Sequence, residues 1–185
     1  MTDITPKDQE IAQPRGLLTA DFLLESDRIS GQVNVRARPL IDQLDDTTSS
    51  FLDLEDVYLS PITRPSELNQ SFPAATLRKT AIHAAVLTRF EDGLSRHQAY
   101  GSYLGHIPHD VLLITSRYQV RGRVVLPPKT QLQTVIAAGT TRFLLVSEAT
   151  ATLTEHPEIS FAGGAILVNM EQVTAFCETD ETHSS

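Results

Sequence analysis

The sequence predicts a mainly β protein built from two tandem copies of a small antiparallel barrel or roll, each with one short helix between its second and third strands. Three observations support this prediction. Short apolar stretches alternate with polar residues at a period of two, which is typical of half-buried strands. The predicted strands follow one another directly, with only one brief helical stretch in each copy. Finally, the pattern around Gly31 returns around Gly122, at an offset of 91 residues (122 − 31).

The internal repeat extends well beyond these two glycines. Apolar residues of the first copy meet apolar residues of the second, with one residue inserted in the second copy before the helix. The matched pairs are Ile29 with Val120, Val33 with Val124, Val35 with Leu126, Leu40 with Leu132, Leu44 with Ile136, Phe51 with Phe143, Leu52 with Leu144 and Leu54 with Val146. We interpret this match as two copies of one small domain.

The first copy opens with two predicted strands. Residues 17–24 are apolar with few breaks, and residues 29–35 alternate between apolar and polar side chains, with Asp27-Arg28 as a tight turn between them. Gly31 lies inside the second strand, where a glycine usually marks a bulge or a close approach of another backbone segment. Gly122 holds the matching place in the second copy, so we expect both glycines to be structural.

A helix and a third strand follow in each copy. Pro39 suits the first turn of a helix. The apolar residues that recur at helical spacing are Leu40, Ile41 and Leu44 in the first copy and Leu132, Val135 and Ile136 in the second. We therefore predict a helix of about two turns in each copy. Residues 51–59 and 143–153 are the predicted third strands.

The ends of the two copies differ in length. Residues 61–73 are rich in Pro, Ser, Asn and Gln, and they predict a loop longer than its counterpart at 154–158. Residues 165–176 predict a buried strand, a turn at 169–172 and a short final strand. Residues 77–89 are the less apolar counterpart of this closing segment.

These assignments divide the chain into five parts. They are a flexible N-terminal tail at 1–16, a first β domain at 17–90, a linker at 91–109, a second β domain at 110–177 and an acidic C-terminal tail at 178–185. Domains of this small size have marginal cores of their own, so we expect the two copies to pack against each other or to oligomerise.

The composition narrows the class of protein. The chain has 185 residues, of which 41% are hydrophobic, and a net charge of −8, which argues against general binding to a nucleic-acid backbone. Cys177 is the only cysteine, so no disulfide can form within the chain. Residues 1–10 are unlike a signal peptide, and no apolar run approaches the ~18 residues that cross a membrane. We expect a cytoplasmic protein that does not enter a membrane.

Two groups of residues are candidates for binding a small ligand between the copies. Arg117, Arg121 and Arg123 share one face of a predicted strand, where they would form a basic stripe for an anion. Tyr100 and Tyr103 of the linker could stack on a ring. The alternatives are a solvated sheet face for the arginines and docking of the linker onto the barrels for the tyrosines.

Candidates for metal binding or catalysis are weaker. His97, His106 and His109 could supply imidazoles to a metal, although their spacing is loose and no cysteine accompanies them. Carboxylates also cluster in the first copy, at Asp42, Asp45, Asp46, Asp53, Glu55 and Asp56. We interpret the carboxylates as a solvated surface, because the ligand spacing of a calcium loop is absent. Neither a nucleophile elbow nor a phosphate-binding loop is present, so we expect no enzymatic activity and no cofactor.

Several motifs resemble a short bacterial all-β domain family whose function is unknown. In the first copy they are Ile29-Ser-Gly-Gln-Val, residues 40–44 and Phe51-Leu-Asp-Leu-Glu-Asp-Val; in the second they are Val120-Arg-Gly-Arg-Val, residues 132–136 and Phe143-Leu-Leu-Val-Ser-Glu-Ala. The closing Ile166-Leu-Val-Asn-Met-Glu-Gln-Val is similar to the last two strands of Sm-like small barrels. The resemblance covers residues 19–90 and 110–176, and it implies a fold but no activity.

The function expected from these observations is that of a non-enzymatic interaction or scaffold module. Two fused β domains would present one composite surface to a protein partner or to a second copy of the chain, through unpaired strand edges. The first alternative is a sensor that binds a small ligand or anion between the two copies. A hydrolase or metalloenzyme based on the linker histidines, and RNA binding by analogy with Sm proteins, are further alternatives.

Overall fold

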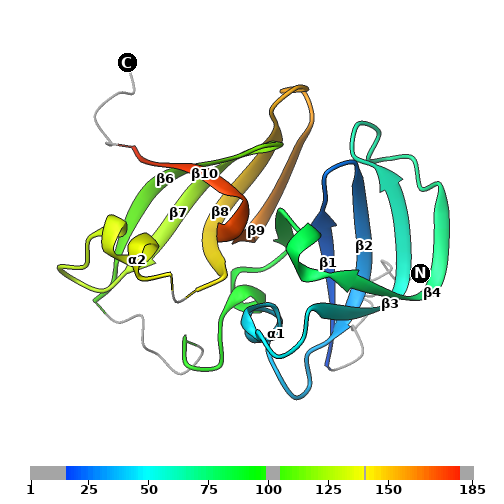
Figure 1. Cartoon of the computed structure of the whole chain (residues 1–185), viewed down its shortest axis with the longest axis horizontal. Coiled ribbons are helices and arrows are strands. Elements are labelled where there is room, and N and C mark those ends of the chain that lie inside the picture. The colour runs from blue at the N-terminus through cyan, green and yellow to red at the C-terminus, as the bar shows by residue number, and fades with distance from the viewer. Residues whose placement is uncertain (1–15, 99–104, 140, 180–185) are drawn as a thin grey trace, which may run out of the picture.

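The computed structural model describes residues 16–98, 105–139 and 141–179, which form one antiparallel sheet of ten strands. The strand order is β10-β6-β7-β8-β9-β5-β1-β2-β3-β4 (Figure 1). The prediction of a mainly β protein is confirmed. The sequence predicts a separate small barrel or roll for each half, but the sheet is not closed into a barrel. Instead, β5 pairs with β9 of the other half, and the two end strands β10 and β4 do not pair with each other.

The two halves of the chain repeat one order of elements. The N-terminal half comprises β1 (Leu17–Leu23), β2 (Asp27–Asn34), α1 (Leu40–Asp45), β3 (Phe51–Pro61), β4 (Gln70–Arg78), the 3-10 helix η1 (Lys79–Ala81) and β5 (Ala84–Leu87). The C-terminal half comprises β6 (Ile107–Thr115), β7 (Tyr118–Leu126), α2 (Leu132–Ala138), β8 (Phe143–Leu153), β9 (Ser160–Asn169), η4 (Met170–Gln172) and β10 (Val173–Glu178). The strands lie as β5-β1-β2-β3-β4 in one half and as β10-β6-β7-β8-β9 in the other.

Both helices lie where the sequence predicts them, between the second and third strands of each half. Pro39 precedes the first residue of α1, and Leu40, Ile41 and Leu44 are buried in the core of the N-terminal half. Helix α2 ends at Ala138, and the capping residue Gly139 has a φ of 58°, a left-handed conformation that glycine adopts without strain. No helix in the described part of the chain is long and apolar enough to cross a membrane.

Gly31 and Gly122 occupy the same place in β2 and β7. At each glycine the register with the next strand shifts, and the bulge opposite holds Asp56 in β3 and Glu148 in β8, both at a φ of 47°. A Cβ atom at Gly122 would lie 2.7 Å from the carbonyl oxygen of Ser147, closer than real Cβ contacts allow. At Gly31 the nearest atom would be 3.4 Å away, which is ordinary contact. The β8 backbone therefore approaches position 122 so closely that only glycine fits there. At position 31 there is room for a Cβ atom.

This difference predicts unequal effects of the same substitution. We expect Gly122→Ala to lower the free energy of unfolding by about 1–2 kcal/mol, because β8 must move to make room for the methyl group. Gly31→Ala should change it by less than about 0.5 kcal/mol. Urea unfolding of the two variants, followed by circular dichroism, measures both values, and equal losses would contradict this account of the two bulges.

The long loop predicted at 61–73 is shorter than expected. Strand β3 runs on to Pro61 and β4 already begins at Gln70, so Pro73 lies within a strand. Among the strands that the structure describes, β4 is at the end of the sheet and pairs with β3 alone, and proline is tolerated in strands at such an edge. The prolines and polar residues of this segment predict a loop. Composition alone does not distinguish an edge strand from a loop.

Strands β5 and β9 form a seam that joins the two halves into one sheet. The residues paired across it are Ala84 with Val168, Ala85 with Leu167, Val86 with Ile166 and Leu87 with Ala165, and all of these side chains are buried. Along each of these two strands, side chains point alternately into the core of one half and into the core of the other. Ala84, Val86, Ile166 and Val168 belong to the core of the C-terminal half, whereas Ala85, Leu87, Ala165 and Leu167 belong to that of the N-terminal half. Each half therefore completes the core of the other.

Side chains also bridge the two halves beside the seam. The buried hydroxyl of Tyr118 donates to the carbonyl oxygen of Leu24 at 2.6 Å, and the Nδ2 atom of Asn169 donates to that of Ile82 at 2.9 Å. The Asp45 carboxylate of α1 accepts from the backbone N–H of Phe143 at 2.8 Å. Burial raises the pKa of Asp45, and this backbone hydrogen bond acts against the increase.

Candidate functional site

The end strands β4 and β10 are the candidate interaction surfaces, because each pairs on one side only within the described residues. For β4, the N–H of Lys79 donates to the carbonyl oxygen of Ser50 at 3.0 Å, so the pair Phe51–Arg78 exchanges no hydrogen bonds of its own. By the alternation of antiparallel strands, the backbone N–H and C=O groups of Arg78, Thr76 and Ala74 point away from β3, toward the open edge.

The same reasoning applies to β10. The N–H of Thr179 donates to the carbonyl oxygen of Asp110 at 2.9 Å, so Val111 and Glu178 form a pair without mutual hydrogen bonds. The backbone groups of Glu178 and Phe176 therefore point away from β6. Both edges offer donors and acceptors in the arrangement that an incoming strand needs.

Large apolar side chains lie near the β4 edge. Phe51 and Tyr58 of β3 and Phe72 of β4 are each about half exposed, at 44%, 44% and 45%. The guanidinium of Arg78 lies 4.8 Å from the centre of the Phe51 ring, an attractive contact between a cation and an aromatic face. This end of the sheet combines open backbone groups with apolar area, as surfaces that bind polypeptides do.

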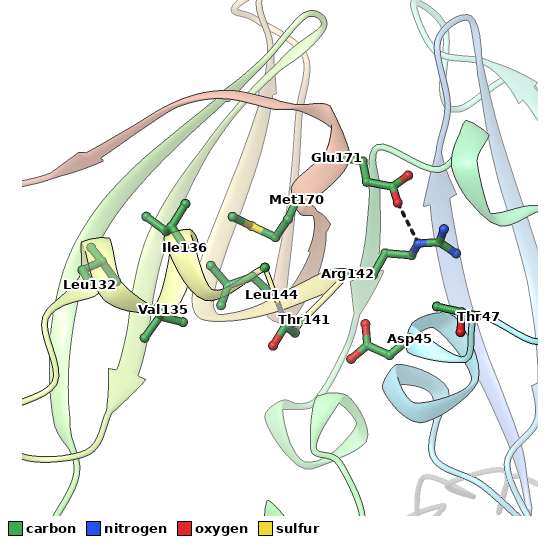
Figure 2. A pocket seen from close by; sticks show the side chains of 11 residues that line it. Asp45, Thr47, Leu132, Val135, Ile136, Thr141, Arg142, Leu144, Met170 and Glu171 are labelled. Carbon is green, nitrogen blue, oxygen red and sulfur yellow. Dashed lines mark hydrogen bonds and ion pairs between the residues drawn. The ribbon is translucent and has the colours of Figure 1, made fainter.

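A pocket of about 350 Å³ lies between the two helices (Figure 2). Its apolar side is formed by α2, the start of β8 and η4, through Leu132, Val135, Ile136, Leu144 and Met170. Asp45 and Thr47 line it from the N-terminal half, and Arg142 and Glu171 form an ion pair with a distance of 3.0 Å between Nε and Oε1. An apolar cavity with a few polar groups at its rim is typical of a small-molecule site.

The predicted ligand residues are not part of this pocket. Arg117 lies in the turn before β7, so it does not share a strand with Arg121 and Arg123. Its guanidinium forms an ion pair with the Glu155 carboxylate at 2.8 Å. Arg123 is neutralised by Asp110 at 3.1 Å and by Glu148 at 3.0 Å. The three arginines therefore do not form one basic stripe. Tyr100 and Tyr103 lie outside the described residues.

The histidine and carboxylate candidates also have other surroundings. His109 lies in β6, where its Nδ1 atom is 2.7 Å from the Glu178 carboxylate. Hydrogen bonds from Thr48 and Arg38 lower the pKa of Asp46, and Asp53 accepts a hydrogen bond from the Thr76 hydroxyl at 3.0 Å. Among the residues that the structure describes, including His97 and His106, no group of three or more His, Cys, Asp or Glu side chains is placed to hold a metal ion.

A polar cluster around the buried His83, beside the seam, was not predicted. His83 is 4% exposed, its Nε2 atom lies 3.2 Å from the Glu25 carboxylate, and its ring contacts the ring of Tyr118 edge-on with centres 5.5 Å apart. Arg117 pairs with the same carboxylate at 3.5 Å. Burial lowers the pKa of His83 even though Glu25 acts to raise it. These residues come from three separate segments of the chain, at Glu25, at His83 and at Arg117-Tyr118, and no local pattern joins them.

The lowered pKa of His83 predicts how stability depends on pH. In the unfolded chain the imidazole titrates near its ordinary value of 6.5, and in the folded chain it titrates lower. Below pH 6.5 the unfolded state therefore binds the proton more readily than the folded state does. The free energy of unfolding should fall as the pH drops from 6.5 to 5. His83→Gln should flatten this part of the curve. If the difference between wild type and variant does not depend on pH, this explanation is wrong.

Comparison with protein-family models, with curated proteins and with solved structures found no match to this chain.

Proposed function

We propose that this protein is a non-enzymatic scaffold module that binds other polypeptide chains through its two open sheet edges. The observation that carries the proposal is the outward alignment of backbone groups at Ala74 and Thr76 of β4 and at Phe176 and Glu178 of β10. An extended segment that adds to such an edge gains main-chain hydrogen bonds, and neighbouring side chains supply specificity.

A duplication of one small β domain accounts for this arrangement. The strand order and the helix position are the same in both halves, and the bulges at Gly31 and Gly122 face residues of equal φ. Fusing two copies in one chain holds two binding edges at a fixed separation and raises the effective concentration of the second for a partner bound to the first. A scaffold with two edges could in this way hold two strands at once.

Site-specific photocrosslinking tests the proposal. A benzoylphenylalanine would be placed at Thr76 on one edge, at Ala175 on the other, and at Arg121 in the interior strand β7 as the matched control. All three positions are exposed. In the cells that make the protein, irradiation should join the two edge positions, but not Arg121, to polypeptide chains. The absence of crosslinked polypeptide at both edges would refute the proposal.

The second candidate is a small-ligand sensor, and the pocket of about 350 Å³ between the helices favours it. The ligand would be a small molecule with an apolar body, placed against Ile136 and Leu144, and an anionic group near Arg142. The sequence-based sensor hypothesis also expects a ligand between the two halves, but at Arg117, Arg121, Arg123, Tyr100 and Tyr103.

A thermal-shift screen with nucleotides and small organic anions tests this candidate. A ligand of the folded state should raise the unfolding midpoint of the wild type and of Arg121→Gln, which changes the predicted stripe. It should have no effect on Arg142→Gln or on Ile136→Trp, which fills the pocket. A shift that is lost in Arg121→Gln and kept in the pocket variants would place the ligand elsewhere.

A further inference from the structure

We infer that the partner of each open edge is a second copy of this chain, with β10 of one molecule added to β4 of the next in a head-to-tail arrangement. The inference rests on the proposed function and names its partner. It starts from the seam, because β5 and β9 already form inside the chain the junction that we expect between chains. Strand β10 is the counterpart of β5, and β4 is the counterpart of β9.

The hydrogen-bond pattern of the seam defines the register of such a junction. The N–H of Asn169 donates to the carbonyl oxygen of His83 at 3.0 Å, so Ala84 and Val168 form a pair without mutual hydrogen bonds. By alternation, Ala85 and Leu167 exchange hydrogen bonds, Val86 and Ile166 do not, and Leu87 and Ala165 do.

Both strands of the seam have counterparts 91 positions away. The pairing of Asp21 with Val86 in the first half matches that of Leu112 with Cys177 in the second, and the pairing of Leu54 with Ala75 matches that of Val146 with Ile166. The seam register is transferred to the open edges by adding 91 to the residue numbers of β5 and subtracting 91 from those of β9. This gives four pairs between two molecules: Ala175 with Leu77, Phe176 with Thr76, Cys177 with Ala75, and Glu178 with Ala74.

The open backbone groups agree with this register. The seam requires that the pairs Phe176–Thr76 and Glu178–Ala74 exchange hydrogen bonds. The backbone groups of these four residues are the ones that point outward, as deduced independently from the bonds of Lys79 to Ser50 and of Thr179 to Asp110. A register shifted by one residue would place inward-pointing groups opposite outward-pointing ones.

Side-chain burial supports the same arrangement. In the seam, Ala84 and Val86 of β5 complete the core of the other half. Their counterparts Ala175 and Cys177 are exposed. In the proposed junction they would lie beside Leu77 and Ala75, which face the core of the N-terminal half of the next molecule. The junction would therefore cover apolar side chains that the single chain leaves open.

One difference from the seam limits the strength of the junction. In β9, Gly163 and Gly164 allow residues 87–90 to pass closely, and a Cβ at Gly163 would lie 2.4 Å from the carbonyl oxygen of Leu87. The counterparts in β4 are Phe72 and Pro73, which have no room for such a passage, and Pro73 has no N–H to donate. The junction should therefore be confined to the four pairs and be reversible. Because head-to-tail contacts repeat, they produce rings or filaments.

Engineered disulfides test the register. Cys177 is the only native cysteine and is exposed. Cys177 and Ala75 would form a pair without mutual hydrogen bonds, in which the side chains are closest and a disulfide can form. Ala75→Cys should therefore give a ladder of disulfide-linked species larger than a dimer under mild oxidation. The matched control is Ser71→Cys on the same strand, which also carries two exposed thiols but out of register with Cys177, so its disulfide-linked species should form much more slowly.

Sedimentation tests the association without covalent trapping. Thr76→Pro removes an N–H that points to the open edge, so it should weaken association of the full chain by at least about tenfold while leaving the pairing with β3 intact. Thr76→Ala keeps this N–H and loses the bond to Asp53, so it should associate like the wild type.

The outcomes separate this inference from the proposed function. A 75–177 linkage identified by mass spectrometry, together with association that only Thr76→Pro weakens, supports the head-to-tail junction. Equal ladders from Ala75→Cys and Ser71→Cys, or a wild-type chain that remains monomeric at millimolar concentration, overturns it. If the edge photocrosslinks then contain other proteins, the scaffold function stands; if they contain no polypeptide, the scaffold function fails as well.

Discussion

Gly163→Ala is expected to lower the free energy of unfolding by at least about 3 kcal/mol, at the upper end of the cost of overpacking. The added methyl carbon would lie 2.4 Å from the carbonyl oxygen of Leu87 and 2.9 Å from a methyl group of Val86. Neither neighbour can move easily, because Leu87 and Val86 belong to the buried strand β5. The substitution should therefore separate β9 from β5 and loosen the seam between the halves.

Denaturant unfolding of the full chain measures this loss, with Gly31→Ala as the control for replacing a strand glycine that has room for a methyl group. A loss of less than about 1 kcal/mol for Gly163→Ala would mean that β5 and β9 are not in close contact.

Asn169→Ala is expected to cost about 2–4 kcal/mol, because it leaves a buried carbonyl oxygen and a part-buried N–H without their partners. The Asn169 side chain is fully buried; its Nδ2 atom donates to the carbonyl oxygen of Ile82 at 2.9 Å, and its Oδ1 atom accepts from the N–H of Glu171 at 3.0 Å. It thus stabilises the start of η4 and connects the end of β9 to the segment before β5.

The control is Asn34→Ala. Asn34 is exposed at the end of β2, and its Oδ1 atom accepts a hydrogen bond from the N–H of Arg36 at 3.1 Å. Its loss should change the free energy of unfolding by about 0.5 kcal/mol or less. Similar losses for both variants would show that burial and the contact across the halves do not determine the role of Asn169.

Elements defined by local patterns could be predicted from the sequence. The spacing of Leu40 and Leu44 after Pro39 predicted α1, since a short amphipathic helix depends on neighbours in the chain. The apolar run from Ala165 to Val168 predicted a buried strand, and the structure buries all four residues in β9. The expected turn at 169–172 is η4, which begins after the capping Asn169.

Features that depend on long-range contacts could not be predicted. The pairing of β5 with β9 joins residues about 80 positions apart, and no pattern within either strand names its partner. Lys79 belongs to the segment 77–89, which the sequence showed only as less apolar than its counterpart. In the structure it is buried and donates to the carbonyl oxygens of Gln43 and Asp46 at the end of α1, with its pKa lowered by burial.

The candidate sites were the least predictable feature. The alternation of Arg121 and Arg123 indicated a basic stripe, but the carboxylates that neutralise Arg123 come from β6 and β8. The apolar residues of α2 were predicted as a helix face. This face lines a pocket only together with Arg142 and Met170, which come from other segments of the chain. The sequence pattern of α2 does not show that these segments lie beside it.

Native-state hydrogen exchange of the full chain, resolved for single amides by NMR, tests the central claim most directly. The claim is that β5 and β9 join the halves into one sheet, while β4 remains open in the single molecule. In dilute protein, the amides of Leu167 and Ala165 should be protected nearly as strongly as the most stable core amides, because they donate across the seam. The amides of their counterparts Thr76 and Ala74 should exchange rapidly. Equal exchange rates at all four positions would contradict the account.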